Sequence, residues 1–249
     1  MSSKSSESRR IFIQNCVSTS VACAGMASPP AARTASAVEL KVKRYLRTKL
    51  IDPRGNPIKS SSLEQGKNYL FHYPFQATPV FLLRLSSPIN GKRQLSNGVD
   101  SYETLPGIGA DSSLIAFSAI CAHKLAYPTP QISFISFSSK LKTKDGSVKT
   151  DIIHCCADHS QYDAKAGALV MSGPAPHPLT SIALEHDTAR DEIYAIGTLG
   201  PEVYDAFFSK YAFKLQLDLG VNATAATRNT AVVHAMDKFC KQTTDCIAP

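Results

Sequence analysis

Short apolar runs alternate with turn residues along most of the chain. From Val38 to about Ile196, segments rich in Val, Ile, Phe, Tyr and Leu are bounded by Pro, Gly, Asn and Asp, a pattern typical of β-strands. Pairs such as Gly55-Asn56 and Asp145-Gly146 supply the positive φ angles of tight turns between them. The pattern predicts an all-β, antiparallel sandwich with strands at Glu39–Leu46, Asn68–Tyr73, Pro79–Leu85, Ser113–Ile120, Gln131–Phe137, Asp151–Cys155, Ala168–Met171, Ser181–Glu185 and Glu192–Ile196.

The pattern changes after Gly197. Pro201–Lys210 and Thr230–Lys241 space their apolar residues at three and four, which predicts short helices, and Ala212–Leu219 between them alternates like a strand. We therefore expect a β domain over residues 38–197 and a short, partly helical C-terminal extension over residues 198–249.

The first 37 residues resemble a twin-arginine export signal. Arg9 and Arg10 stand directly before Ile11-Phe12-Ile13, and a weakly apolar segment of small residues follows. The resemblance implies a protein in the periplasm, or on the periplasmic face of the inner membrane if the signal is kept as an anchor. It also implies export of a folded chain, which suits a cofactor inserted before export. The alternative is a basic tail without a targeting role.

Composition and charge narrow the class of protein. The 249 residues are 43% hydrophobic and carry 27 Lys+Arg against 20 Asp+Glu. Four of the basic residues and one acidic residue lie in the first 37 positions, so the rest of the chain has a charge of +4, too little to favour nucleic-acid binding. No run reaches the roughly 18 apolar residues of a membrane-spanning helix, which excludes a multi-pass membrane protein.

Two short segments combine cysteine with histidine after strand-like runs. The first is Cys121-Ala122-His123, and the second is Cys155-Cys156-Ala157-Asp158-His159. Two such loops facing each other offer two thiolates and two imidazoles. Zinc accepts this donor set, and so does a Rieske [2Fe–2S] cluster, in which two cysteines hold one iron and two histidines hold the other.

The flanking residues favour the cluster. The run from Cys156 to Asp163 resembles the second box of the Rieske iron–sulfur family, Cys-x-x-His-Gly-Ser-x-Tyr/Phe-Asp, and Gly173–Leu179 is similar to the family's proline loop. The resemblance covers roughly residues 113–197 and implies a [2Fe–2S] cofactor. It implies that Cys121 and Cys156 bind the buried iron, that His123 and His159 bind the outer iron, and that the hydroxyls of Ser160 and Tyr162 hydrogen-bond the cluster and its ligands.

The segments depart from the family pattern in three places. Lys124-Leu125-Ala126-Tyr127 stands where many members have Leu-Gly-Cys, so the usual disulfide between the two loops is not expected. The long gap between the two boxes predicts a hairpin insertion near residues 130–150. The Gly that the family pattern places between His and Ser is absent after His159. If the box is aligned on Ser-x-Tyr-Asp instead, Cys155 becomes the alternative ligand. In the C-terminal extension, Cys240 and Cys246 are close enough in sequence to form a disulfide.

The resemblance implies an electron-transfer subunit rather than a catalyst on its own. The export signal favours the small subunit of a periplasmic molybdenum oxidoreductase of the arsenite oxidase type, with cytochrome c or quinol as further partners. The alternative is the iron–sulfur subunit of a quinol–cytochrome c reductase. A Rieske oxygenase needs a second iron site, for which the region after Gly197 offers only His234. A structural zinc-binding β domain is the remaining class.

Overall fold

The computed structural model describes residues 41–96 and 100–246. The expected export signal and its boundary at residue 37 lie outside the described residues. Within them, no helix is long and apolar enough to cross a membrane.

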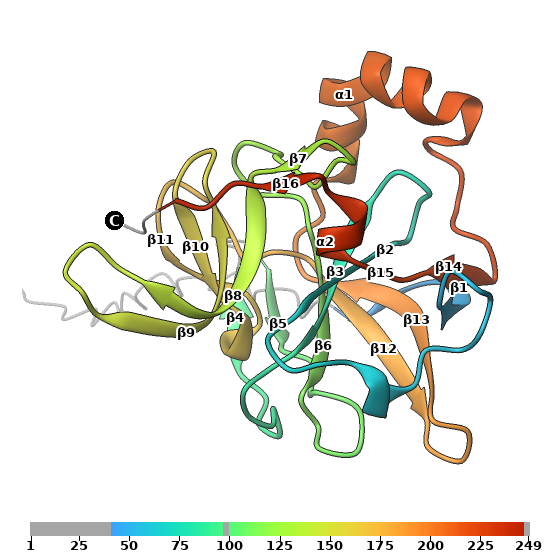
Figure 1. Ribbon diagram of the computed structural model, residues 1–249, viewed down its shortest axis with the longest axis horizontal. Coiled ribbons are helices and arrows are strands. Elements are labelled where there is room, and N and C mark those ends of the chain that lie inside the picture. The colour runs from blue at the N-terminus through green and yellow to red at the C-terminus, as the bar shows by residue number, and fades with distance from the viewer. Residues whose placement is uncertain (1–40, 97–99, 247–249) are drawn as a thin grey trace, which may run out of the picture. The chain divides into compact units, whose positions relative to one another are not determined.

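An eight-stranded sheet forms the larger part of the fold (Figure 1). Its strand order is β14-β1-β13-β12-β6-β3-β2-β15, and every pairing is antiparallel except that of β1 with β14. Val233 alone separates the two edge strands β14 and β15, so the edges of the sheet meet and the sheet is nearly closed. The strands are β1 Lys43–Ile51, β2 Asn68–His72, β3 Pro79–Arg84, β6 Leu114–Ser118, β12 Ser181–Asp187, β13 Glu192–Leu199, β14 Thr230–Val232 and β15 His234–Ala235.

A four-stranded antiparallel sheet in the order β11-β10-β9-β8 carries the second Cys/His segment. Its strands are β8 Ile135–Lys142, β9 Val148–Cys155, β10 Ser160–Asp163 and β11 Leu169–Ser172. Strands β8 and β9 form a hairpin whose turn lies between Lys142 and Val148, where the sequence predicts one. Two small two-stranded sheets pair β4 Gln94–Ser96 with β5 Ser101–Glu103, and β7 Ile132–Ser133 with β16 Gln242–Thr243.

These strands confirm the all-β fold class, and each of the nine segments predicted between residues 38 and 197 overlaps a strand. The main strand that was not predicted is β10, Ser160–Asp163. Its residues are mostly polar, yet Ser160, Gln161 and Tyr162 are all buried. Short 3₁₀ turns at Ser60–Ser62, Ala164–Ala166 and Gly220–Asn222 complete the connections.

The C-terminal extension differs from the prediction in both of its parts. A single helix, α1 Tyr204–Leu219, replaces the expected helix and strand, with a kink at Tyr211. The alternation of Phe213, Leu215 and Leu217 indicated a strand with one buried face. In the helix only Leu215 is buried, while Phe213 is 77% and Leu217 is 70% exposed. The second expected helix shrinks to α2 Met236–Phe239, because the residues before it join the large sheet as β14 and β15.

Side chains alternate across the large sheet, so both of its faces are buried. Phe81, Leu83 and Phe117 point into a core shared with Ile135 and Ile153 of the small sheet. The neighbouring residues of the same strands, such as Leu82 and Ala116, point into a second core. This is the period of two expected for strands. The first core also contains two cysteines, Cys121 and Cys155.

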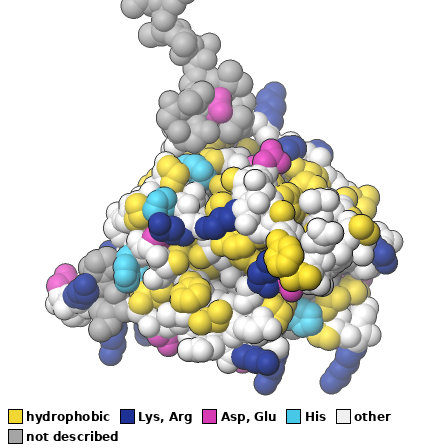
Figure 2. All heavy atoms as spheres, turned by 90° about the horizontal axis from the view of Figure 1, so that it is seen from above, with side chains coloured by type: hydrophobic (Ala, Val, Ile, Leu, Met, Phe, Trp, Pro, Cys, Tyr) yellow, Lys and Arg dark blue, Asp and Glu magenta, His cyan; other side chains and the backbone are white. Residues whose placement is uncertain are grey.

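Charged side chains are spread over the surface. Figure 2 shows Lys and Arg side chains dispersed among hydrophobic and polar ones on the face drawn, without a single basic patch. This distribution agrees with the low charge expected for the chain beyond its first 37 residues.

Candidate metal centre

The first Cys/His segment lies in a tight loop directly after β6. The backbone N–H of Cys121 donates to the carbonyl of Ala126 at 2.9 Å, and the N–H of Leu125 donates back to the carbonyl of Cys121 at 3.0 Å. Leu125 takes a positive φ of 57° to close this loop. As a result the side chain of Cys121 is completely buried, whereas that of His123 is 37% exposed.

The second segment connects β9 to β10. Cys155 ends β9 and pairs with Ser160, the first residue of β10, so residues 156–159 form the connecting loop. The N–H of His159 donates to the carbonyl of Cys155 at 2.7 Å, and His159 has a φ of 61°. This left-handed conformation is uncommon for residues other than Gly. The loop leaves Cys155 buried and His159 exposed.

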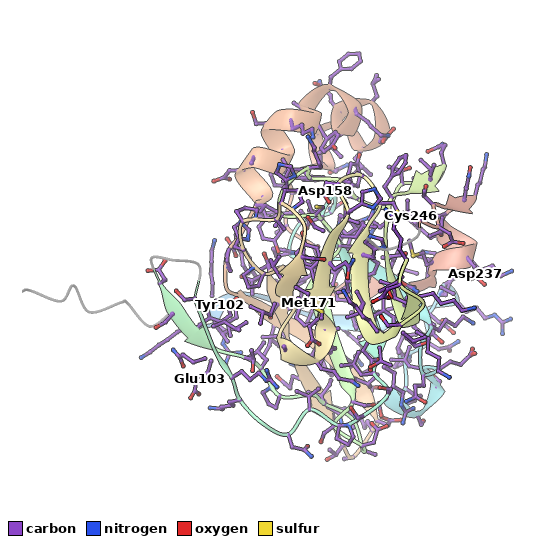
Figure 3. The ribbon with its side chains drawn as sticks, turned by 90° about the vertical axis from the view of Figure 1, so that its left-hand side faces the viewer. Tyr102, Glu103, Asp158, Met171, Asp237 and Cys246 are labelled. Carbon is purple, nitrogen blue, oxygen red and sulfur yellow. A yellow bond between two sulfur atoms is a disulfide. The ribbon has the colours of Figure 1, made fainter. Side chains whose placement is uncertain are left out.

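The two loops bring Cys121, Cys155 and Asp158 together. One ligand atom of each, a sulfur or a carboxylate oxygen, lies within 4.8 Å of the other two. Oδ2 of Asp158 is 3.3 Å from Sγ of Cys121 and 3.0 Å from Nδ1 of His123. Two thiols and a carboxylate therefore converge between the loops, and the imidazole of His123 contacts the carboxylate. Figure 3 shows Asp158 and Cys246 in the upper half of the view, below α1 and away from Tyr102 and Glu103.

Hydrogen bonds shift the pKa values of the two thiols in opposite directions. The side chain of Cys155 donates to the sulfur of Cys121, which lowers the pKa of Cys121 and raises the pKa of Cys155. Backbone N–H groups of His123 and Lys124 also point at the Cys121 sulfur and lower its pKa. Hydrogen bonds that favour the thiolate prepare a cysteine for metal binding, because the thiolate is the ligand form.

Tyr162 and Ser160 hold the two loops and the proline loop in place. The hydroxyl of Tyr162 lies 3.5 Å from Sγ of Cys121 and accepts the N–H of Ala122 at 3.2 Å. Oγ of Ser160 accepts the N–H of Ala175 in the proline loop at 3.1 Å. Both side chains are completely buried.

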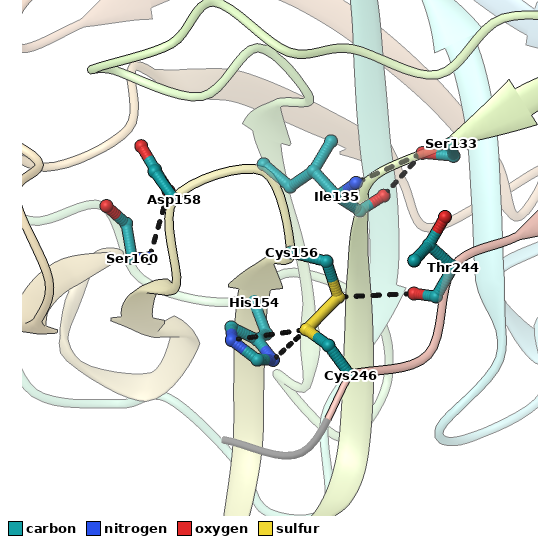
Figure 4. Close-up of a disulfide and its surroundings, with 8 residues drawn as sticks. All are labelled: Ser133, Ile135, His154, Cys156, Asp158, Ser160, Thr244 and Cys246. Atoms are coloured by element: carbon teal, nitrogen blue, oxygen red, sulfur yellow. Dashed lines mark hydrogen bonds between the residues drawn. A yellow bond between two sulfur atoms is a disulfide. The ribbon is translucent and has the colours of Figure 1, made fainter. Parts of the chain in front are cut away.

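The structure corrects the choice of Cys156 as the cluster thiolate. Cys156 is bonded to Cys246 in a disulfide (Figure 4), so its sulfur is not a free thiolate. Cys155 is the free thiol whose sulfur lies within 4.8 Å of that of Cys121. The reason is strand alternation: Cys155 shares the inward face of β9 with Ile153, and the next residue points away from the core. Because Cys246 is bonded to Cys156, it does not form the disulfide with Cys240 that their spacing allowed, and Cys240 is a free, buried thiol.

His159 does not join the converging side chains. Its ring lies 5.9 Å from the ring of His154, centroid to centroid, and these two histidines form a separate group with Cys246. Sulfur of Cys246 lies 3.5 Å from Nδ1 of His154. Of the expected site residues, the structure thus brings together Cys121, His123 and Tyr162, and it places His159 on the other side of its loop.

Sequence reasoning did not single out Asp158. A usable signal was present, because Asp158 is the third residue after Cys155, the spacing that the Rieske box uses between its cysteine and its histidine. His159, one residue later, was predicted as the ligand instead.

Fold and site together define an all-β protein in which two loops bring two buried thiols and a carboxylate together, with an exposed imidazole in contact with the carboxylate. No family model matches the chain. It is 29% identical over 143 residues to the iodate reductase subunit IdrB of Pseudomonas sp. (strain SCT), over 56% of this chain and 57% of that protein. The chain thus spans little more than half the length of this curated relative.

Among solved structures, the chain is similar to the soluble domain of the Rieske protein II (soxF) from Sulfolobus acidocaldarius. The identity is 29%, the match covers 62% of this chain and 78% of that chain, and the TM-score is 0.39. Since this score is too low to compare the two folds, the all-β class of this chain follows from its own strands.

Proposed function

We propose that this chain is a Rieske-type electron-transfer protein that carries a [2Fe–2S] cluster between its two loops. The observation that carries the proposal is the convergence of two buried cysteines, Cys121 and Cys155, with Asp158, whose carboxylate contacts the exposed imidazole of His123. Buried thiolates and a more exposed imidazole are the arrangement that a cluster with one inner and one outer iron requires. When bound, such a cluster accepts and releases one electron.

The residues of the chain fit this cofactor in three ways. Cys121 and Cys155 supply thiolates from the rim of the hydrophobic core, which keeps water from the inner side of the site. Backbone N–H groups and the hydroxyl of Tyr162 point at the Cys121 sulfur, and such bonds stabilise the more negative, reduced state. His123 would hold the outer side, where an electron can leave toward a partner.

The proposed setting is a redox complex. The curated relative is named as a subunit of an iodate reductase, which supports a partnership with a catalytic subunit. We place the chain as the small subunit of an oxidoreductase of the arsenite oxidase type, with the iron–sulfur subunit of a quinol–cytochrome c reductase as the alternative. The twin arginines Arg9 and Arg10 support export to the periplasm.

Metal analysis and electron paramagnetic resonance (EPR) test the cofactor. We expect protein purified without added metal to contain two irons and two acid-labile sulfides per chain, and dithionite-reduced protein to give a rhombic EPR signal with the low average g of a histidine-ligated cluster. Cys155→Ser should abolish the signal, and Cys240→Ser serves as the control because Cys240 is also buried and free. A colourless protein with stoichiometric zinc would contradict the proposal and favour a structural zinc domain.

A further inference from the structure

Asp158 is a buried carboxylate aimed at the thiol site. Its side chain is only 3% exposed, although it belongs to a loop. Oδ2 lies 3.0 Å from Nδ1 of His123 and 3.3 Å from Sγ of Cys121, and a carboxylate oxygen lies within 4.8 Å of Sγ of Cys155. A carboxylate held at this depth costs free energy unless it is paired or coordinates a metal. Its partners here are themselves metal-ligand types.

The carboxylate is held in this orientation by its own loop. Its other oxygen, Oδ1, accepts the backbone N–H of Ser160 at 3.0 Å (Figure 4). One oxygen is thus fixed by the backbone while the other is presented to the two thiols and His123. A ligand oriented in this way needs little rearrangement when a metal binds.

His159 is held on the opposite side of the loop. Its ring lies beside His154, and its positive φ fixes the backbone that carries it. The proline loop packs directly on this backbone: a Cβ at Gly173 would lie 2.6 Å from Cα of Ser160 and 2.9 Å from the carbonyl oxygen of His159. Turning the His159 ring toward the thiols would require this tightly packed segment to move.

The register of the second box points the same way. With Cys155 as its first residue, the box Cys-x-x-His-Gly-Ser-x-Tyr-Asp places Asp158 at the His position and His159 at the Gly position. Ser160, Tyr162 and Asp163 then match without any shift. The left-handed φ of His159 is the conformation that Gly favours, so backbone and register agree.

We propose that Asp158, and not His159, is the fourth ligand of the metal centre, alongside Cys121, Cys155 and His123. The inference rests on the proposed function for the identity of the cofactor. A carboxylate in place of a neutral imidazole adds one negative charge, so the cluster would be harder to reduce than one with two histidines.

Three variants separate the two candidate ligands. Asp158→Asn keeps the acceptor for the Ser160 N–H but removes the charge. Asp158→His supplies an imidazole at the same position. His159→Gly is the control, since Gly adopts the positive φ of this residue without strain.

Nitrogen couplings in the EPR of the reduced protein count the imidazole ligands. We expect pulsed EPR on protein labelled with ¹⁵N-histidine to show one strongly coupled histidine in the wild type and in His159→Gly. Asp158→His should show two and should have a more positive reduction potential. Two coupled histidines in the wild type, or loss of one in His159→Gly, would overturn the assignment.

A metal titration tests Asp158 independently of the cluster. Co²⁺ alone is added to metal-free, reduced protein, and thiolate-to-metal absorption is followed. We expect His159→Gly to bind Co²⁺ as the wild type does, and Asp158→Asn to bind at least about tenfold more weakly. If the protein lacks iron and sulfide, the proposed function fails, yet this titration still decides the ligand. Equal binding by Asp158→Asn and the wild type would overturn the inference.

Discussion

Tyr162 connects the two loops of the site through a single hydroxyl. Its oxygen accepts the N–H of Ala122 and lies against the sulfur of Cys121. Burial raises the pKa of Tyr162, which keeps the phenol protonated and able to donate to a thiolate. The same hydroxyl therefore contributes both to folding and to the electronic state of the sulfur.

Tyr162→Phe should weaken the protein and lower its reduction potential. The buried N–H of Ala122 loses its acceptor, which costs about 1–3 kcal/mol of unfolding free energy. The Cys121 sulfur loses a donor that favours the reduced state. Urea denaturation and protein-film voltammetry measure the two effects.

Tyr102→Phe is the matched control for this change. Tyr102 is as deeply buried as Tyr162, but its hydroxyl has no hydrogen-bond partner among the described residues. We expect this variant to keep the potential and to be at least as stable as the wild type. Equal effects of the two substitutions would show that Tyr162 acts by packing alone.

At the scale of elements, the disulfide attaches the end of the chain to the site. Cys246 follows β16, which pairs with β7, and its partner Cys156 begins the loop between β9 and β10. The bonded residues are 90 positions apart in sequence. The bond thus fixes the outer side of the loop that carries Asp158.

Cys246→Ser should destabilise the protein under oxidising conditions. Closing so long a loop removes entropy from the unfolded chain, and loss of such a bond typically costs about 2–5 kcal/mol. Thermal unfolding with and without reductant measures the effect. Reductant should lower the unfolding temperature of the wild type to that of the variant, and should leave the unfolding temperature of the variant unchanged.

Cys240→Ala provides the comparison, because it removes a buried thiol that forms no disulfide. The unfolding temperature of Cys240→Ala should fall when reductant is added, as that of the wild type does. A wild type that is insensitive to reductant would contradict the disulfide.

At the scale of the whole molecule, His72 links folding to pH. It lies on β2 of the large sheet, with its ring 5.9 Å from that of Phe239. Burial, with a smaller contribution from His234, lowers the pKa of His72 to about 4. The neutral imidazole is therefore the form that the fold accepts.

The sign of the effect follows from this lowered pKa. Above pH 6.5 His72 is neutral in both states, and between about 6.5 and 4 the unfolded chain binds a proton that the folded chain does not. Stability should fall through this window by up to about 1.4 kcal/mol per pH unit. Carboxylates such as Asp191, whose pKa is held low by the Ser60 hydroxyl, act at lower pH.

His72→Gln should flatten the stability profile in this window. Unfolding free energies from urea titrations at several pH values between 7 and 4 provide the measurement, with His177→Gln as the control because His177 lies in the proline loop, away from β2. A profile that keeps its slope in His72→Gln would assign the acid sensitivity to other groups.

The sequence by itself determined the fold class and the two segments of the site. Strand periodicity and turn residues are local signals, so nearly every long strand was predictable, and the Cys/His segments made Cys121 and His123 candidate ligands without tertiary information. The helix over Ala212–Leu219 could not be predicted, because its apolar residues alternate as in a strand. In the structure Phe213 and Leu217 are exposed on α1.

Only the tertiary structure decided between neighbouring residues in the second segment. Cys155 and Cys156 have the same chemistry, and spacing along the chain cannot say which one faces the core. The pairing of β9 with β8 and β10 turns Cys155 inward, and the distant Cys246 then takes Cys156. The same loop geometry turns Asp158 inward and His159 outward. Side-chain direction changes at every residue, and long-range packing fixes it.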